Sequence, residues 1–274
     1  LTAKEKGYTH FTFAFSGGEP TLFPGFENIV KTLYAEGVDV TFTSNASRKL
    51  DFWQNMAPHF NHCVWSYHPE MVKQEEFFEK AKFITEHCWL NVDFMMTPEH
   101  FAPNIELGRK LSELPNIRVD YLPIQVEFGG LSQGLIDYSP EQLHFLQNVP
   151  QVFKAMEGNV REKIQKFKVF GRGQKMVVRR INGNRIEETL NYKNLIARDE
   201  IKFSGWKCFA GIESLIVNLD GTVQRAYCNQ GGIIGDIWNS LSLPKDPVIC
   251  TVERCKCSVD IEVTKFNGEY DERI

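Results

Sequence analysis

A glycine-rich turn is the first part of this sequence that could carry chemistry. The strand-like run FTFAF is followed directly by Ser16, Gly17, Gly18, Glu19 and Pro20. Two consecutive glycines let a backbone approach a ligand with no Cβ in the way, and a glutamate supplies an acceptor for an ammonium group. The proline then fixes the exit of the turn. The pattern predicts a ligand-binding turn, although a tight loop without a ligand can have the same composition.

A second group of chemically active residues is a set of cysteines in the last third of the chain. In an intracellular protein such crowding indicates metal or redox chemistry before disulfides. Four thiolates suit either a [4Fe–4S] cluster or tetrahedral zinc, and the close pair Cys255 and Cys257 favours the cluster. By contrast, Cys63 and Cys88 stand alone in apolar runs and are predicted to be buried structural thiols. The candidate metal ligands are Cys208, Cys228, Cys250, Cys255 and Cys257.

Alternating strand-like and helical segments must position these residues. Such βα repeats predict a parallel sheet, either a full or partial barrel or an open doubly wound sheet, and both place ligands at the carboxyl ends of the strands. The expected strands are 11–15, 39–43, 63–67, 91–96 and 118–124. The expected helices are 26–36, 49–57, 74–87 and 105–113.

The character of the chain changes after this α/β part. The sequences EFGG and SQG indicate loop, and Ser139 followed by Pro140 indicates the start of a helical region. Turn residues at 182–184 and at 220–221 then predict two hairpins. We therefore expect three parts, namely a core at 1–127, a helical linker and hairpin at 128–200, and a small β-rich domain at 201–274.

The composition is that of an ordinary globular protein. The 274 residues are 42% hydrophobic and carry a net charge of −4, with a pI near 6.0. No stretch approaches the roughly 20 apolar residues of a membrane span, and the first ten residues lack the apolar core of a signal peptide. The charge supplies no basic field for nucleic acid. We expect a cytoplasmic protein, with nucleic-acid and membrane partners unsupported.

The segment FAFSGGEPTLFPGFENIV resembles the second strand of radical S-adenosylmethionine enzymes. That resemblance implies that Gly17, Gly18, Glu19 and Pro20 hold the amino group of the cofactor's methionine portion. Two later segments are similar to the third and fourth strands of the family. They imply cofactor contacts from Ser44, Asn45 and Ser66, for which ordinary strand-end capping is the alternative. Ala46 stands where the family commonly has Gly.

The element that defines the family, Cys-x3-Cys-x2-Cys, is not found in this sequence. Only 15 residues precede Ser16, and none of them is Cys. The resemblance therefore implies a partial (β/α)6 TIM-like barrel with its first strand missing, truncated before the ligands of the catalytic [4Fe–4S] cluster. We expect that segment upstream of Leu1 in the coding sequence, and we expect this chain alone to be inactive.

The C-terminal cysteines resemble those of the twitch and SPASM auxiliary-cluster domains, which open with Cys-x9–15-Gly-x4-Cys. Twelve residues separate Cys208 from Gly221, which fits this pattern, but six separate Gly221 from Cys228. Five cysteines are too few for two full clusters. The resemblance thus implies one auxiliary [4Fe–4S] cluster.

The implied activity is reductive cleavage of S-adenosylmethionine to a 5′-deoxyadenosyl radical, which abstracts hydrogen from a peptide or small-molecule substrate. An electron donor such as flavodoxin or ferredoxin is the implied partner. His68 and Glu70 follow the strand 63–67 and are candidates for acid or base catalysis, with hydrogen-bonded loop residues as the alternative. Asp120, Tyr121, Gln125 and Glu127 are candidates to meet the substrate. The alternatives are a non-catalytic zinc- or iron–sulfur-binding module and a peptide-recognition scaffold.

Overall fold

Five parallel strands form the main sheet of this computed structural model. They lie side by side in chain order, as β1 (Thr12–Phe15), β2 (Asp39–Ser44), β3 (His62–Tyr67), β4 (Trp89–Met96) and β5 (Ile117–Pro123), and β8 (Val152–Phe153) extends the β5 edge antiparallel. The α/β expectation is confirmed. The structure describes residues 12–128, 131–149, 152–153, 156–166, 178–182, 185–189, 192–255 and 257–267.

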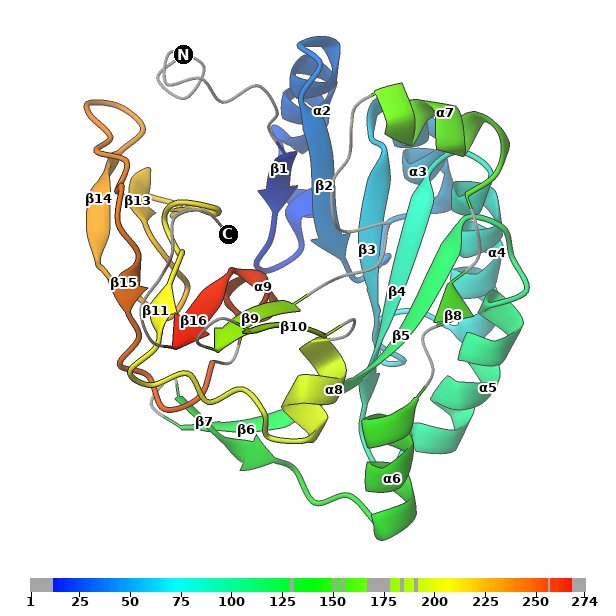
Figure 1. The fold of residues 1–274 in the computed structure, drawn as a ribbon. Helices are drawn as coiled ribbons and strands as arrows, with labels where there is room; N and C mark the ends of the chain where they lie inside the picture. Colours follow the sequence, from blue (N-terminus) through cyan, green and yellow to red (C-terminus); the bar gives the residue numbers. More distant parts are fainter. Residues whose placement is uncertain are drawn as a thin grey trace. The chain divides into compact units, whose positions relative to one another are not determined.

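Helices connect the parallel strands and cover one face of the sheet (Figure 1). Aromatic side chains fill the space between helices and sheet, as Trp53 packs on Trp65, Trp65 on Phe77, and Phe94 on Tyr121. The expected strands and helices are confirmed to within a few residues at their ends, apart from Phe11, which lies outside the described residues. The connecting elements are η1 (Pro20–Leu22), α2 (Phe26–Ala35), α3 (Leu50–Met56), η2 (Ala57–His59), α4 (Gln74–Thr85) and α5 (Phe101–Leu111).

Side chains alternate between the two faces of the sheet along each strand. The face opposite the helices carries several polar side chains. In register, Ser66 lies beside Asp93, and Asp93 lies beside Asp120. The guanidinium of Arg118 is 2.7 Å from Asp120, and both side chains are buried. Tyr121, one position further along β5, faces the helices, so its expected role in meeting a substrate is wrong.

Two further helices belong to the same contact unit, which comprises Leu1–Ile124 and Ser139–Gln174. α6 (Pro140–Asn148) begins with a capping box between Ser139 and Gln142, as the Ser-Pro sequence predicts. α7 (Gly158–Lys166) packs Val160 against Trp89. This helical segment therefore makes its contacts with the parallel-sheet unit.

The second contact unit, Gln125–Tyr138 with Lys175–Ile274, is built from small sheets. The hairpins expected near 182–184 and 220–221 are confirmed as β9/β10 and β12/β13. Residues expected to be loop instead form the hairpin β6 (Gln125–Phe128) and β7 (Leu131–Leu135), for which the sequence signal is the Gly-Gly pair between them.

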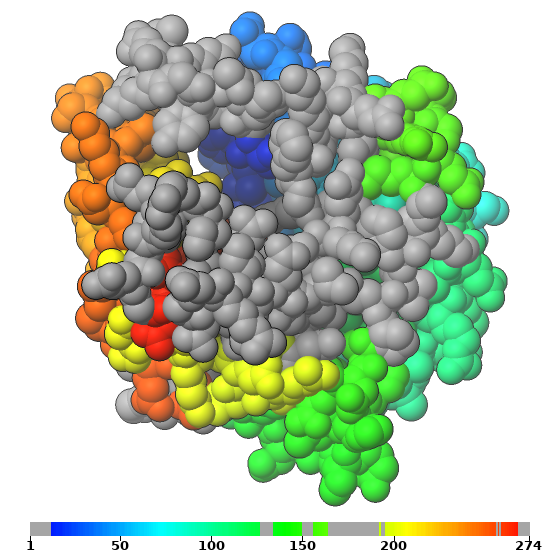
Figure 2. All heavy atoms as spheres, viewed as in Figure 1, coloured from blue at the N-terminus to red at the C-terminus, as the bar shows by residue number. Residues whose placement is uncertain are grey.

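The larger sheet of this unit has the order β10-β9-β16-β11-β15, and the smaller has β12-β13-β14. Ile233 of β14 and Trp238 beyond it are exposed, on a segment coloured orange in Figure 2. The described apolar core lies instead around Cys208, Ala210, Ala226 and Val263. The elements are β9 (Val178–Asn182), β10 (Arg185–Thr189), α8 (Tyr192–Ala197), β11 (Lys207–Cys208), β12 (Ile216–Val217), β13 (Thr222–Gln224), β14 (Ile233–Asp236), β15 (Val248–Ile249), α9 (Ser258–Glu262) and β16 (Lys265–Asn267).

Among the described residues, no helix is long and apolar enough to cross a lipid bilayer.

Candidate functional site

The turn after β1 has the backbone shape that its glycines predict. Gly17 and Gly18 have φ angles of 91° and 57°, in the left-handed region that favours glycine. Among the residues that the structure describes, no atom lies within 4 Å of a Cβ built on either glycine. Within this part of the chain, the glycines therefore serve the backbone conformation rather than close packing.

The carboxylate of Glu19 ties this turn to the end of the next strand. Its Oε1 accepts hydrogen bonds from Thr21 N at 3.1 Å, Thr21 Oγ1 at 2.6 Å and Ser44 Oγ at 3.0 Å. Among the described residues, its Oε2 accepts one hydrogen bond, from Asn45 N at 2.7 Å. A carboxylate offers roughly four acceptor positions over its two oxygens, about two on each. Within the described part of the chain, Oε2 thus keeps an acceptor position for an ammonium group, while Oε1 is committed to the protein.

The predicted residues after β2 lie in this same network. Ser44 is buried and also accepts a hydrogen bond from Ala46 N at 3.0 Å. The Oδ1 of Asn45 accepts from Ser47 N at 3.0 Å. Within the described part of the chain, the Nδ2 group of Asn45 forms no hydrogen bond, so it is available to a ligand. Ser44, by contrast, uses its hydroxyl proton on Glu19.

The backbone conformation of Ala46 is one that favours glycine. Its φ is 56°, a left-handed conformation that costs a non-glycine residue roughly 1–2 kcal/mol. The buried ammonium of Lys80 in α4 donates to Ala46 O at 2.9 Å and pairs with Glu76 at 2.6 Å. Lys80 therefore fixes the loop that carries Ser44 and Asn45. The sequence did not indicate that Lys80 would bind this loop, because a lysine on an amphipathic helix is ordinarily exposed.

Replacing Lys80 by Met is expected to destabilise the protein by about 1–3 kcal/mol, because the buried carbonyl of Ala46 loses its donor. Denaturation in urea measures the change. Lys82, which is exposed on the same helix, provides the matched control, and Lys82→Met should change stability by less than about 0.5 kcal/mol. Equal effects of the two variants would contradict the assigned role of Lys80.

Ser66 is near the end of β3, half-buried, on the polar face of the sheet. The carboxyl ends of parallel strands meet at one edge of a sheet. Glu19 after β1, Asn45 after β2 and Ser66 near the end of β3 therefore lie along the same edge. The hydrogen bonds join Glu19, Ser44 and Asn45 directly, and Ser66 lies one strand further along.

His68 and Glu70 lie beyond the same end of β3. Nδ1 of His68 is 3.3 Å from Oε1 of Glu70, and the Glu70 side chain is exposed while that of His68 is half-buried. The hydrogen bond from its own backbone N–H lowers the pKa of Glu70, burial raises it, and the interactions with His68 and His100 lower it further. His100, whose Nδ1 is 3.1 Å from Thr97 Oγ1, is a neighbour that the sequence did not reveal. The pair stays a candidate acid and base.

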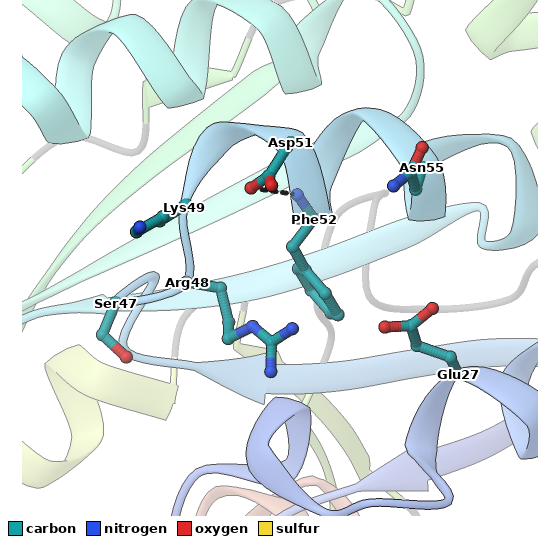
Figure 3. Close-up of a pocket in the computed structure, with 7 residues that line it drawn as sticks. All are labelled: Glu27, Ser47, Arg48, Lys49, Asp51, Phe52 and Asn55. Atoms are coloured by element: carbon teal, nitrogen blue, oxygen red, sulfur yellow. Dashed lines mark hydrogen bonds between the residues drawn. The ribbon is translucent and has the colours of Figure 1, made fainter.

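A surface pocket of 390 Å³ lies beside this edge of the sheet (Figure 3). Arg48 stands 4.3 Å from the ring centre of Phe52 and donates to Thr21 O at 3.2 Å. The pocket includes none of the predicted cofactor residues. Arg48, which lines the pocket, supports the glycine-containing turn only through its hydrogen bond to Thr21 O. The pocket is lined by Glu27, Ser47, Arg48, Lys49, Asp51, Phe52 and Asn55.

The C-terminal cysteines gather in the second unit. Cys208 lies in β11, whose two neighbouring strands are β15 and β16. Cys250 follows β15, and its N–H donates to Trp206 O at 2.8 Å. The N–H of Cys228 donates to the buried carboxylate of Asp260 at 2.9 Å. Cys255 is buried, and Cys257 precedes α9.

The pKa shifts show which of these thiols are neighbours. Burial raises the pKa of Cys228 to about 12, and Cys250 adds to the rise. Burial likewise raises the pKa of Cys250 and, more strongly, that of Cys255, with contributions from Cys208 to both and from Cys228 to Cys255. Cys208, Cys228, Cys250 and Cys255 are therefore electrostatic neighbours. All seven cysteines are free of disulfides.

In the described residues, no three His, Cys, Asp or Glu side chains are placed to hold a metal ion. The fit of a metal group therefore rests on the chemistry of the donors, because four thiols near one another are the ligand set that iron–sulfur clusters and tetrahedral zinc require. Cys63 and Cys88 are both fully buried in the parallel-sheet unit, as predicted. Burial and a contact with Cys88 raise the pKa of Cys63 well above its usual range, which is typical of an inert thiol.

The structure is that of an α/β protein with a glycine-containing turn at the carboxyl edge of a parallel sheet, joined to a cysteine-bearing β unit. No protein-family model matches the sequence, and no curated protein matches it. Among solved structures, Streptococcus suis SuiB matches with a TM-score of 0.45 and 15% identity, covering 85% of this chain and 52% of that one. SuiB bound to S-adenosylmethionine matches with a TM-score of 0.35 and 17% identity, covering 48% and 34%. The chain thus spans about half or less of these proteins, and a likeness this distant carries no argument about function.

Proposed function

We propose that this chain is part of a radical S-adenosylmethionine enzyme, with a partial (β/α)6 barrel that binds the cofactor and a twitch-like domain that holds an auxiliary cluster. The observation that carries the proposal is the hydrogen-bonded Glu19 beside two glycines over which the described residues leave open space. It supports a site for a group that bears an ammonium, such as the methionine end of S-adenosylmethionine.

Each predicted residue has a role in this proposal. Gly17 and Gly18 admit the methionine portion to the backbone, and Oε2 of Glu19 accepts a hydrogen bond from its amino group. Pro20 fixes the exit of the turn. Asn45 donates its side-chain amide to the cofactor, and Ser66 meets its ribose. Ser44 acts through Glu19, whose carboxylate it orients.

The catalytic [4Fe–4S] cluster would supply one electron, which cleaves S-adenosylmethionine into methionine and a 5′-deoxyadenosyl radical. Its Cys-x3-Cys-x2-Cys ligands are not in this sequence, so we place them in another segment of the protein. The electron originates from a donor such as flavodoxin or ferredoxin. The substrate is a peptide or small molecule that gives up a hydrogen atom, with His68 and Glu70 as candidates to move a proton. Such oxygen-sensitive chemistry fits a cytoplasmic location.

Binding of S-adenosylmethionine to the whole protein, reconstituted with iron and sulfide without oxygen, tests this proposal. Equilibrium dialysis with labelled cofactor should show one bound molecule per chain, and methionine should compete for the site. A whole protein that contains iron but does not bind the cofactor would refute the proposed site.

For the auxiliary cluster we propose Cys208, Cys228, Cys250 and Cys255 as the four ligands, because each of these thiols interacts electrostatically with at least one other. Metal and sulfide analysis of the 274-residue chain assembled without oxygen should find four irons and four sulfides. Cys255→Ser should lose most of the iron. The matched variant Cys88→Ser, at a buried thiol of the parallel-sheet unit, should retain it. Zinc without iron or sulfide would instead establish the alternative, a zinc-binding module.

A further inference from the structure

A buried ammonium group lies beside the clustered thiols. Lys265 of β16 is the cross-strand partner of Cys208 in β11, and antiparallel partners place their side chains on the same face of a sheet. Only 1% of Lys265 is exposed. The positive charge is therefore enclosed in the protein next to one of the proposed ligands.

The contacts of this ammonium group are neutral. It donates to the carbonyls of Asp260, Ile261 and Val263, the latter two at 3.3 and 2.9 Å, around the C-terminal end of α9. It also stands 5.0 Å from the ring centre of Phe203. In the described parts of the chain, Lys265 forms no ion pair with a carboxylate. Helix-end carbonyls satisfy its protons and attract its charge, but they do not neutralise it.

The side chain of Asp260, whose carbonyl accepts from Lys265, has another role. The carboxylate of Asp260, itself buried, accepts hydrogen bonds from the backbone N–H groups of Tyr227 at 3.2 Å and Cys228 at 2.9 Å. It thereby holds the turn that carries Cys228. A buried charge is costly unless an opposite charge lies nearby, and the groups near Lys265 that become anionic on binding a metal are the thiols.

We propose that Lys265 is the buried cation that sets the reduction potential of the metal centre held by Cys208, Cys228, Cys250 and Cys255, an inference that rests on the proposed function. The centre takes up one electron from an external donor of the ferredoxin or flavodoxin class, with no bond made or broken. The added negative charge is stabilised by a nearby cation, and more strongly where water is excluded. Charge and hydrogen bonds around a cluster are known determinants of its potential.

Lys265 and Asp260 are both buried and carry opposite charges. Removing one charge or the other should therefore shift the potential in opposite directions, which provides an internal control.

Lys265→Met tests the proposal, since Met keeps much of the length of the side chain and removes its charge. A redox titration of the iron-loaded 274-residue chain, followed by electron paramagnetic resonance, should show a more negative potential. We expect the reduction equilibrium constant to fall at least tenfold, which is 59 mV for one electron. Lys207, the neighbour of Cys208, lies on the other face of the sheet, 5.2 Å from the ring centre of Phe266. Lys207→Met removes the same charge and should leave the potential unchanged.

Asp260→Asn should shift the potential in the positive direction. If the Lys265→Met protein fails to retain iron, the Asp260→Asn protein still tests whether buried charge sets the potential, because a general loss of structure would not raise it. Full iron content with an unchanged potential in the Lys265→Met or the Asp260→Asn protein overturns this inference alone. A wild-type chain that holds no iron–sulfur centre overturns the auxiliary cluster and this inference together.

Discussion

Glu19→Gln is expected to weaken binding of S-adenosylmethionine to the whole protein by about 10- to 100-fold, the equivalent of one hydrogen bond to a charged group. From described residues the carboxylate accepts four hydrogen bonds, three at Oε1 and one at Oε2. An amide keeps one oxygen, so its NH2 group must face either Asn45 N or the donors from Thr21 and Ser44. The turn then loses its connection to β2, and the ammonium of the ligand loses its acceptor.

Glu27→Gln is the matched control for this substitution. Glu27 lies in α2 of the same unit and forms an exposed ion pair with Lys31 at 3.6 Å. Such pairs contribute about 0–1 kcal/mol, so the control should bind the cofactor like the wild type. Equal binding by the Glu19→Gln protein and the control would show that Glu19 has only a structural role.

Arg118→Met is expected to destabilise the protein by about 3–5 kcal/mol, because it leaves the buried carboxylate of Asp120 without its cation. Nε of Arg118 is 2.7 Å from Asp120 Oδ2, with side-chain exposures of 1% and 3%, and Nη2 donates to Oδ1 at 3.2 Å. Denaturation in urea at neutral pH measures the loss. The double variant Arg118→Met with Asp120→Asn should lose less stability than the sum of its single variants, since no carboxylate is then left behind.

Arg109→Met controls for the loss of an arginine. Arg109 is exposed in α5, and its replacement should change stability by less than about 0.5 kcal/mol. If the Arg118 variant proved no less stable than this control, the ion pair would not hold the polar face of the sheet together.

The sequence predicts the parallel-sheet unit well because each element there has a strong local signal. Strands such as β3 and β4 are short β-branched or aromatic runs, and Ser139 with Pro140 marks the start of α6. The β6–β7 hairpin was missed because β6 has only four residues and β7, Leu-Ser-Gln-Gly-Leu, does not alternate apolar and polar residues. Its Gly129–Gly130 pair was the only indication.

The sequence predicted which residues form the candidate site, but not the contacts between them. The sequence indicated that Glu19 and Ser44 belong together through resemblance, yet their hydrogen bond, across 25 residues of chain, is a tertiary feature. Lys80 and Lys265 could not be found, because a lysine in a helix or strand is ordinarily exposed. Tyr121 was misplaced because strand-end position does not tell which face of a sheet a side chain occupies.

Formation of 5′-deoxyadenosine tests the central claim most directly. The whole protein, reconstituted with iron and sulfide and given S-adenosylmethionine and dithionite without oxygen, should form it, whereas the 274-residue chain should form none. An iron-loaded whole protein that forms no 5′-deoxyadenosine, or a 274-residue chain that does, would contradict the account.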